Sequence, residues 1–188
     1  MPGKVVPKTV DLQLLRLAKK GDTVAQKAIY DFLSPKMYPV CLRYMAERMA
    51  AEDVLQDGFV TLFSKLDSFT GVGSFEGWAR KLFVNTALMA LRKNDILKDT
   101  EEIEVAYNVT NSATSAVQNI GYKEIMQLIS ELPPGFRTVF NMYVIEGYSH
   151  KEIGLALGIS ENTSRSQLQR ARVLLQSRIT ELDDERKK

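Results

Sequence analysis

The segment from Tyr148 to Leu175 constrains the fold most, because it combines a helix start, a glycine turn and a basic helix. Ser149 and Glu152 have the spacing of a capping box, in which each side chain accepts a hydrogen bond from the other residue's backbone N–H. Gly158 can adopt the positive φ angle that a tight turn between helices requires. Ser160 then stands where it can cap a second helix. The segment predicts two short helices around a turn, an arrangement that places the second helix in the major groove of DNA.

The predicted second helix has an apolar face and a polar face. Leu168, Ala171 and Leu175 repeat at helical spacing, and we expect them to be buried. The candidate DNA-binding residues of this helix are polar or basic: Asn162, Thr163, Arg165, Ser166, Gln169, Arg170 and Arg172. Those nearer the N-terminus are expected to face bases, and Arg170 and Arg172 are expected to bind phosphates. The alternative is an ordinary amphipathic helix whose charges only contact water.

The bulk composition excludes several classes of site. The 188-residue chain has a formal net charge of only +2, so DNA binding would have to come from local clusters of basic residues. The single cysteine and single histidine, Cys41 and His150, exclude an internal disulfide framework and a Cys/His zinc site. We expect no metal ion, no cofactor and no catalytic role for His150. No stretch approaches the ~20 apolar residues of a membrane span and no signal peptide is seen, so the expected location is cytoplasmic.

Helical periodicity dominates the rest of the chain, and the alternating pattern of strands is missing. Helices are predicted at about 10–19, 22–33, 34–48, 51–66, 75–92, 117–130 and 133–147, ahead of the two in the opening segment. Pro35 is expected to restart the third helix, and Pro39 to kink it. Residues 98–116 are acidic and then rich in Asn, Ser and Thr, which predicts a flexible linker. The expected fold class is all-α, with two small helical domains at residues 1–97 and 117–188.

A second pattern lies in Ala51–Phe59, where acidic and amide side chains oppose an apolar face. Asp53, Gln56 and Asp57 fall on one polar stripe of the predicted helix. A stripe of this kind suits a basic protein partner better than DNA. Taken alone, it equally fits a face that only contacts solvent.

Read in order, the motifs resemble a known family. AEDVLQDGFVTLF, a glycine loop, FEGWARKLFVNTALMALRK, a linker, LPPGFRTVFNMYVIEGYSHKEIGLALGIS and TSRSQLQRARVLL are similar to bacterial sigma factors of the sigma-70 family, in the extracytoplasmic-function (ECF) group. The resemblance covers about Leu12 to Leu175. It implies that 1–97 is region 2, 98–116 a linker and 117–188 region 4. It also implies a non-enzymatic initiation subunit that binds core RNA polymerase and recognises the −10 and −35 promoter elements.

The resemblance implies a role for each motif. Asp53, Gln56 and Asp57 match the motif that binds the clamp helices of the polymerase β′ subunit. The glycine loop Ser68–Ser74 and the start of the helix that follows it match the part that captures an unstacked −10 base. The implied −10 residues are Ser68, Phe69, Phe75, Trp78, Arg80 and Asn85, with Trp78 expected mainly to pack. The segment Leu132–Tyr143 would contact the β flap, the last helix would bind the −35 element, and an anti-sigma factor is a further expected partner.

The sequence departs from the family pattern at three positions. Ser164 stands where Val is usual, Gln167 where Arg or another basic residue is usual, and Met89 where an acidic residue is frequent. These departures predict an unusual −35 preference more than any change of fold.

Two other functions compete with this interpretation. A stand-alone helix-turn-helix regulator that binds operator DNA as a dimer would leave Ala51–Phe59 and the Trp78 helix unexplained. The second alternative is an enzyme with an appended DNA-binding domain. The sequence contains no phosphate-binding glycine loop and no metal-ligand cluster that would support it.

Overall fold

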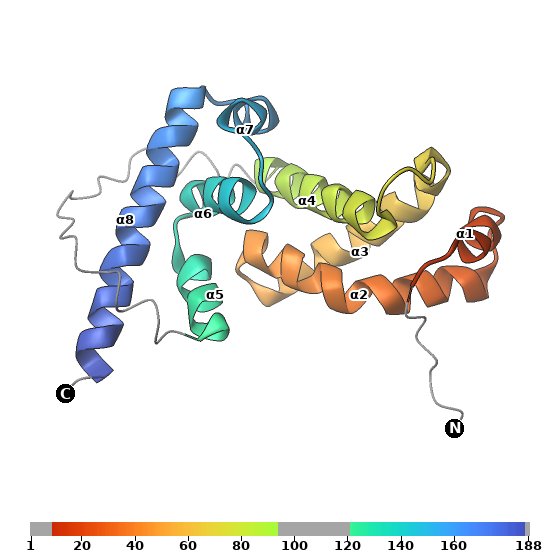
Figure 1. Ribbon diagram of the computed structural model, residues 1–188, viewed down its shortest axis with the longest axis horizontal. Coiled ribbons are helices and arrows are strands. Elements are labelled where there is room, and N and C mark those ends of the chain that lie inside the picture. Colours follow the sequence, from red (N-terminus) through yellow and green to blue (C-terminus); the bar gives the residue numbers. More distant parts are fainter. Residues whose placement is uncertain (1–8, 94–120, 187–188) are drawn as a thin grey trace. The chain divides into compact units, whose positions relative to one another are not determined.

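The computed structural model describes residues 9–93 and 121–186, and within these ranges every regular element is a helix (Figure 1). The elements are α1 (Leu12–Lys19), α2 (Thr23–Met45), α3 (Arg48–Ser64), η1 (Leu66–Ser68), α4 (Phe75–Lys93), α5 (Tyr122–Glu131), α6 (Pro134–Phe140), η4 (Asn141–Ile145), α7 (His150–Leu157) and α8 (Glu161–Arg186). The expected all-α class is confirmed. The chain divides into two compact units, Met1–Ala90 and Leu91–Lys188. The expected linker at 98–116 lies outside the described residues.

The core of the first unit forms where α2 packs along α3 and α1 packs against α2. On α2 the fully buried side chains recur at helical spacing: Ile29, Leu33, Met37, Val40, Cys41 and Tyr44. Phe59 of α3 meets Phe83 of α4 edge to face, with ring centroids 5.0 Å apart. Burial raises the pKa of the Cys41 thiol to about 12, which agrees with its expected role as a small core residue.

One expectation for this unit was wrong. The chain was expected to break at Ser34 and start a new helix at Pro35, but α2 runs without interruption from Thr23 to Met45 through both prolines. An interior proline costs about 3 kcal/mol in a helix. Each large apolar side chain that α2 buries contributes about 1.5–3 kcal/mol, and such residues lie on both sides of Pro35 and Pro39. The tertiary packing therefore outweighs the local helix-breaking signal.

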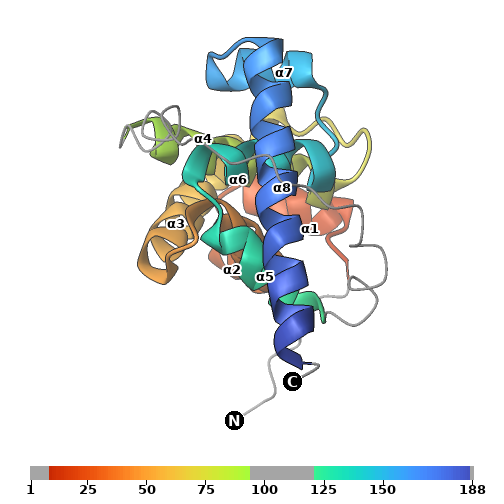
Figure 2. The same cartoon turned by 90° about the vertical axis from the view of Figure 1, so that its left-hand side faces the viewer.

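In the second unit α6 and α7 both pack against the long helix α8 (Figure 2). Its core cluster contains Leu132, Phe136 and Ala171, with Phe140, Leu174 and Leu175 packed around them. The buried Arg137 donates hydrogen bonds to the backbone oxygens of Ser130 and Leu132 at 3.0 and 2.8 Å, which satisfies carbonyls at the end of α5. Burial lowers the pKa of its guanidinium.

The helix α8 is longer than the sequence suggested. The opening segment predicted two short helices, but α8 has 26 residues and continues to Arg186. Arg186 forms an ion pair with Glu124 of α5, so the end of α8 lies beside α5. Among the helices that the structure describes, none combines the length and apolar character needed to cross a bilayer.

Candidate nucleic-acid and protein interfaces

The α7–α8 pair forms the predicted helix-turn-helix. The Glu152 carboxylate accepts the Ser149 N–H at 2.8 Å, and the Ser149 hydroxyl accepts the Glu152 N–H at 3.3 Å, which confirms the capping box. Gly158 ends α7 with a φ of 71°, in the left-handed region. Ser160 caps α8 by accepting the Thr163 N–H at 2.9 Å. All the local signals in this segment therefore act as the sequence indicated.

Five of the seven candidate residues on α8 share its exposed side: Asn162, Arg165, Ser166, Gln169 and Arg172. At about 100° per residue they span an arc of about 120° around the helix. The opposite arc is buried and carries Ser164, Gln167, Leu168 and Ala171. A helix in a major groove needs this division, because its polar side chains must reach base edges while its other side packs on the protein.

Two candidates lie apart from that exposed arc. Thr163 is half-buried, and its hydroxyl is 2.9 Å from the Ser160 hydroxyl, within the helix cap. Arg170 is also half-buried, and its guanidinium carbon is 6.0 Å from the centre of the Phe136 ring. Their surroundings fit helix capping and packing as well as DNA contact.

The departures at Ser164 and Gln167 do not lie on the candidate DNA-binding face. Their exposed fractions are 0% and 7%, and both point into the protein. The interpretation that these two residues alter −35 contacts therefore needs correction, because neither has a direct route to a base. Helical periodicity explains the error, since both share the buried side with Leu168 and Ala171.

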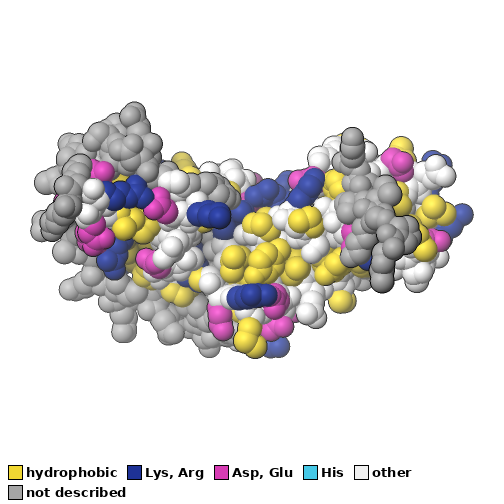
Figure 3. Space-filling model, turned by 90° about the horizontal axis from the view of Figure 1, so that it is seen from below, with side chains coloured by type: hydrophobic (Ala, Val, Ile, Leu, Met, Phe, Trp, Pro, Cys, Tyr) yellow, Lys and Arg dark blue, Asp and Glu magenta, His cyan; other side chains and the backbone are white. Residues whose placement is uncertain are grey.

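The exposed arc of α8 carries two arginines, Arg165 and Arg172. Arg165 forms a salt bridge of 3.2 Å with Glu161, and both side chains are largely exposed, so the pair adds at most about 1 kcal/mol. Burial, followed by the charge of Arg165, lowers the pKa of His150. On the face drawn in Figure 3, acidic and basic side chains are interspersed, which agrees with a net charge of +2.

The candidate protein-binding stripe of α3 is exposed. Asp53, Gln56 and Asp57 all reach solvent, whereas the opposite side of the helix is buried in the core. Met49 and Val60, with exposed fractions of 72% and 70%, lie on the same side of α3 at either end of the stripe. The sequence interpretation missed these two residues. Met49 is four residues from Asp53 and Val60 is four residues from Gln56, and this spacing places them on the same side of a helix. Exposed apolar side chains beside carboxylates favour a protein partner over DNA.

The aromatic residues implied for −10 binding form a cluster. Trp78 lies 5.4 Å from Phe69 and 5.6 Å from Phe75, measured between ring centroids, and both phenylalanines are buried. The expected packing role of Trp78 agrees with these contacts. The Ser68 hydroxyl donates to the Lys65 backbone oxygen at 2.7 Å, so it stabilises the turn that leads into the loop.

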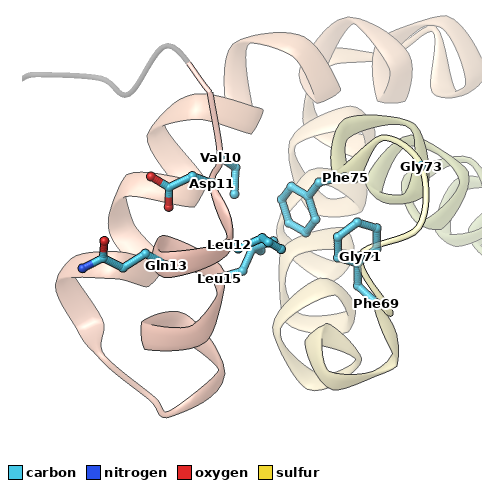
Figure 4. Close-up of a pocket in the computed structure, with 9 residues that line it drawn as sticks. All are labelled: Val10, Asp11, Leu12, Gln13, Leu15, Phe69, Gly71, Gly73 and Phe75. Carbon is cyan, nitrogen blue, oxygen red and sulfur yellow. The ribbon is translucent and has the colours of Figure 1, made fainter.

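A pocket of about 550 Å³ lies beside this cluster, between the glycine loop and α1 (Figure 4). This volume is within the roughly 300–1,000 Å³ of typical ligand sites. The walls come from residues far apart in sequence: Val10, Leu12, Leu15, Phe69, Gly71, Gly73 and Phe75. Leu12 and Phe75 point toward one another, whereas Asp11 and Gln13 point away from the cavity (Figure 4). The contribution of α1 was missed, because nothing in the local sequence signals a contact of this range.

The remaining −10 candidates lie on α4. Asn85 is exposed and is two turns from Trp78 on the same side of the helix, whereas Arg80 is about 200° from Trp78 around the axis. The structure therefore does not bring Arg80 onto the face of the other two. Lys81 and Arg92 are exposed within about 40° of Asn85, and the sequence interpretation missed both. Lysine and arginine beside an amide suit a nucleic-acid backbone next to a base.

Among the described residues, no group of three or more His, Cys, Asp or Glu side chains is placed to hold a metal ion. The chain does match two family models. The model "Sigma-70 region 2" matches residues 29–96 and "Sigma-70, region 4" matches residues 122–175, so together they cover more than half of the chain.

Curated relatives span nearly the same length. The ECF RNA polymerase sigma factor SigW of Bacillus subtilis is 28% identical over 179 residues, which is 89% of this chain and 96% of that protein. The ECF RNA polymerase sigma-E factor of Haemophilus influenzae is 25% identical over 183 residues, covering 92% of this chain and 96% of that one.

A solved structure has the same fold. The sigma factor RpoE of Bartonella quintana, determined in complex with the anti-sigma factor NepR, superposes with a TM-score of 0.50 at 19% identity, covering 84% of this chain and 97% of that one. The two family models occur in the order that the motifs predicted, with a helix-turn-helix in the second. This chain belongs to the sigma-70 family, in its extracytoplasmic-function group.

Proposed function

We propose that this chain is an initiation subunit that binds core RNA polymerase and directs it to promoters by binding their −35 and −10 elements. The observation that carries the proposal is the exposed arc of α8, where Arg165, Ser166 and Gln169 stand together on the second helix of a helix-turn-helix. The chain has no chemical step of its own in this account, and it acts in the cytoplasm, where polymerase and promoters meet.

The −35 element is the target of α8. Asn162, Arg165 and Ser166 lie in the N-terminal half of the helix, which is the part that meets base edges in this motif. Arg172, on the same exposed arc, binds a phosphate. Arg165 has to leave Glu161 to reach a base, and that exposed ion pair costs little to break.

Polymerase binds the exposed stripe of α3. Asp53, Gln56 and Asp57 supply negative charge and hydrogen-bonding groups for the clamp helices of the β′ subunit. Met49 and Val60 supply apolar area at the two ends of the stripe. In this assignment residues 1–97 bind the clamp and the −10 element, residues 98–116 connect the domains, and residues 117–188 bind the −35 element. The segment Leu132–Tyr143 contacts the β flap.

The −10 element is opened beside α4. Removing a base from the stack costs a few kcal/mol, so the protein must supply contacts that offset this cost. The pocket between the glycine loop and α1 has aromatic and apolar walls that suit a base. Asn85 can bond a base edge, and Lys81 and Arg92 can hold the strand's phosphates.

The low net charge is consistent with promoter binding that polymerase and this chain share. With a formal net charge of +2, the free protein has little electrostatic attraction for DNA, and polymerase supplies much of the binding surface. An anti-sigma factor, the partner class of the Bartonella relative, is a further proposed partner, which would cover the polymerase-binding surfaces and keep the protein inactive.

Gel shifts with and without core polymerase test the proposal. We expect specific promoter binding only when both proteins are present. Tight, specific duplex binding by this chain alone would favour the stand-alone helix-turn-helix regulator instead.

A further inference from the structure

We propose that His150 is a positioning residue that sets, through Ser164, the angle at which α8 meets the −35 element. The inference rests on the proposed function, because it concerns how the same helix is held while it recognises promoter DNA. His150 is the only histidine of the chain, and the proposed contacts leave it without a role.

The packing of α7 on α8 includes close contacts towards both ends of α7. At its C-terminal end, Gly158 turns the chain, and Gly154 lies so close that a Cβ there would be 2.8 Å from the Ile159 backbone oxygen. At its N-terminal end, His150 Nδ1 lies 2.9 Å from Ser164 Oγ. A contact one α7 length away from the turn restricts the angle between the two helices further, in addition to their packing.

The hydrogen bond between His150 and Ser164 is partly buried. Ser164 has an exposed fraction of 0%, so its hydroxyl depends on protein partners rather than water. It directly precedes Arg165 and Ser166, two residues of the exposed arc. A change in the position of Ser164 therefore moves both recognition side chains with it.

A third element fixes the imidazole itself. The Tyr143 ring, from η4, stacks on His150 with centroids 4.4 Å apart and an angle of 21° between the planes. The ring is thus held between η4 and α8, which restricts its rotation. Tyr143 ends the segment proposed to contact the β flap, so the same stack joins that segment to the recognition helix.

The charges around the ring favour its neutral form. Burial is the largest cause that lowers the pKa of His150. The charges of Arg165 and Arg172 on α8 lower this pKa further, whereas the charge of Glu161 raises it. Neutral imidazole with its own proton on Nε2 accepts a hydrogen bond at Nδ1 from the Ser164 hydroxyl, which keeps its proton. Asparagine is the variant that best retains a hydrogen-bonding group at the position of Nδ1.

The test uses holoenzyme assembled from core polymerase and the full chain, on a promoter selected by run-off transcription. The measured quantity is the ratio of affinities for that promoter and for a version with one −35 base pair changed. We expect His150→Ala and Ser164→Ala each to lower this ratio roughly fivefold, as loss of one hydrogen bond predicts. His150→Asn should recover most of the ratio, and the double alanine variant should resemble either single variant.

The matched control is Ser177→Ala, which removes a hydroxyl that bonds Glu181 at 3.2 Å on the exposed part of α8, and it should leave the ratio unchanged. Additive losses in the double variant would overturn the proposal. So would an equal loss of affinity for both promoters in His150→Ala, since a phosphate contact would have that effect. If His150→Ala does not fold, His150→Asn and Ser164→Ala decide the question. Failure of the proposed function is distinguishable, because wild-type holoenzyme would then select no promoter.

Discussion

Gly58 of α3 lies directly against the Phe83 ring of α4, and a Cβ at position 58 would overlap ring carbons Cδ1 and Cε1. The two helices carry different proposed interfaces, for polymerase and for the −10 element. Their close approach therefore holds the two interfaces in a fixed relation within the first unit.

Replacing Gly58 with alanine should destabilise the protein by about 1–3 kcal/mol, because the added methyl group forces the buried Phe83 ring or the helices to move. Thermal or urea unfolding measures the change. Gly77→Ala is the matched control, since a Cβ there would have only ordinary contacts with Ser74 at 3.6 Å or more. An unchanged midpoint for Gly58→Ala would show that α3 and α4 do not pack as described.

Changing Asp53 and Gln56 together to alanine should weaken binding to core polymerase without lowering the unfolding midpoint. Both side chains are exposed, so their removal leaves no cavity and no unpaired buried group. Co-purification with core enzyme gives the binding result, and Asp184→Ala on the exposed end of α8 controls for loss of negative charge. Unchanged co-purification would count against the clamp assignment.

Arg165→Ala should reduce discrimination at particular −35 base pairs by about 1–3 kcal/mol, because an arginine that bonds a base carries sequence information. Arg172→Ala should weaken binding to all promoter variants by a similar factor, as expected for a phosphate contact. Affinities of holoenzyme for a set of single-base −35 variants separate the two patterns. A uniform loss for Arg165→Ala would identify it as a phosphate contact instead.

Leu12→Ser should impair opening of the −10 element while leaving the fold intact. Leu12 forms one wall of the pocket beside the glycine loop, yet its exposed fraction is 64%, so little core packing is lost. Permanganate reactivity of unpaired thymines in the polymerase complex reports opening, and Val24→Ser, an exposed change away from the pocket lining, serves as the control. Equal opening of the −10 element in both variants would show that this pocket does not capture a base.

The local chemistry of helix ends was predictable from the sequence. The Ser149–Glu152 capping box and the turn at Gly158 depend on residues within a few positions of one another, and all of them formed as expected. The exposed stripe of α3 also followed from helical spacing, as did five of the seven candidate residues on α8. Spacing correctly separated the exposed Asp53 from the buried core of α3.

The errors arose where distant parts of the chain decide the outcome. A new helix was expected to start at Pro35, but packing of α2 on α3 keeps one continuous helix through this position. Ser164 was interpreted from a family pattern as changing −35 contacts directly, but it lies buried beside His150 and has no direct route to a base. The Leu12 wall of the pocket arises from a contact between α1 and a loop more than fifty residues away, and no local pattern encodes such a contact.

Run-off transcription with core RNA polymerase on a genomic promoter library tests the central claim most directly. We predict that core enzyme alone gives no promoter-specific transcripts. Addition of this chain should produce discrete transcripts whose templates share a −35 and a −10 sequence at fixed spacing. Transcripts that do not depend on the chain, or specific operator binding by the chain without polymerase, would contradict the account.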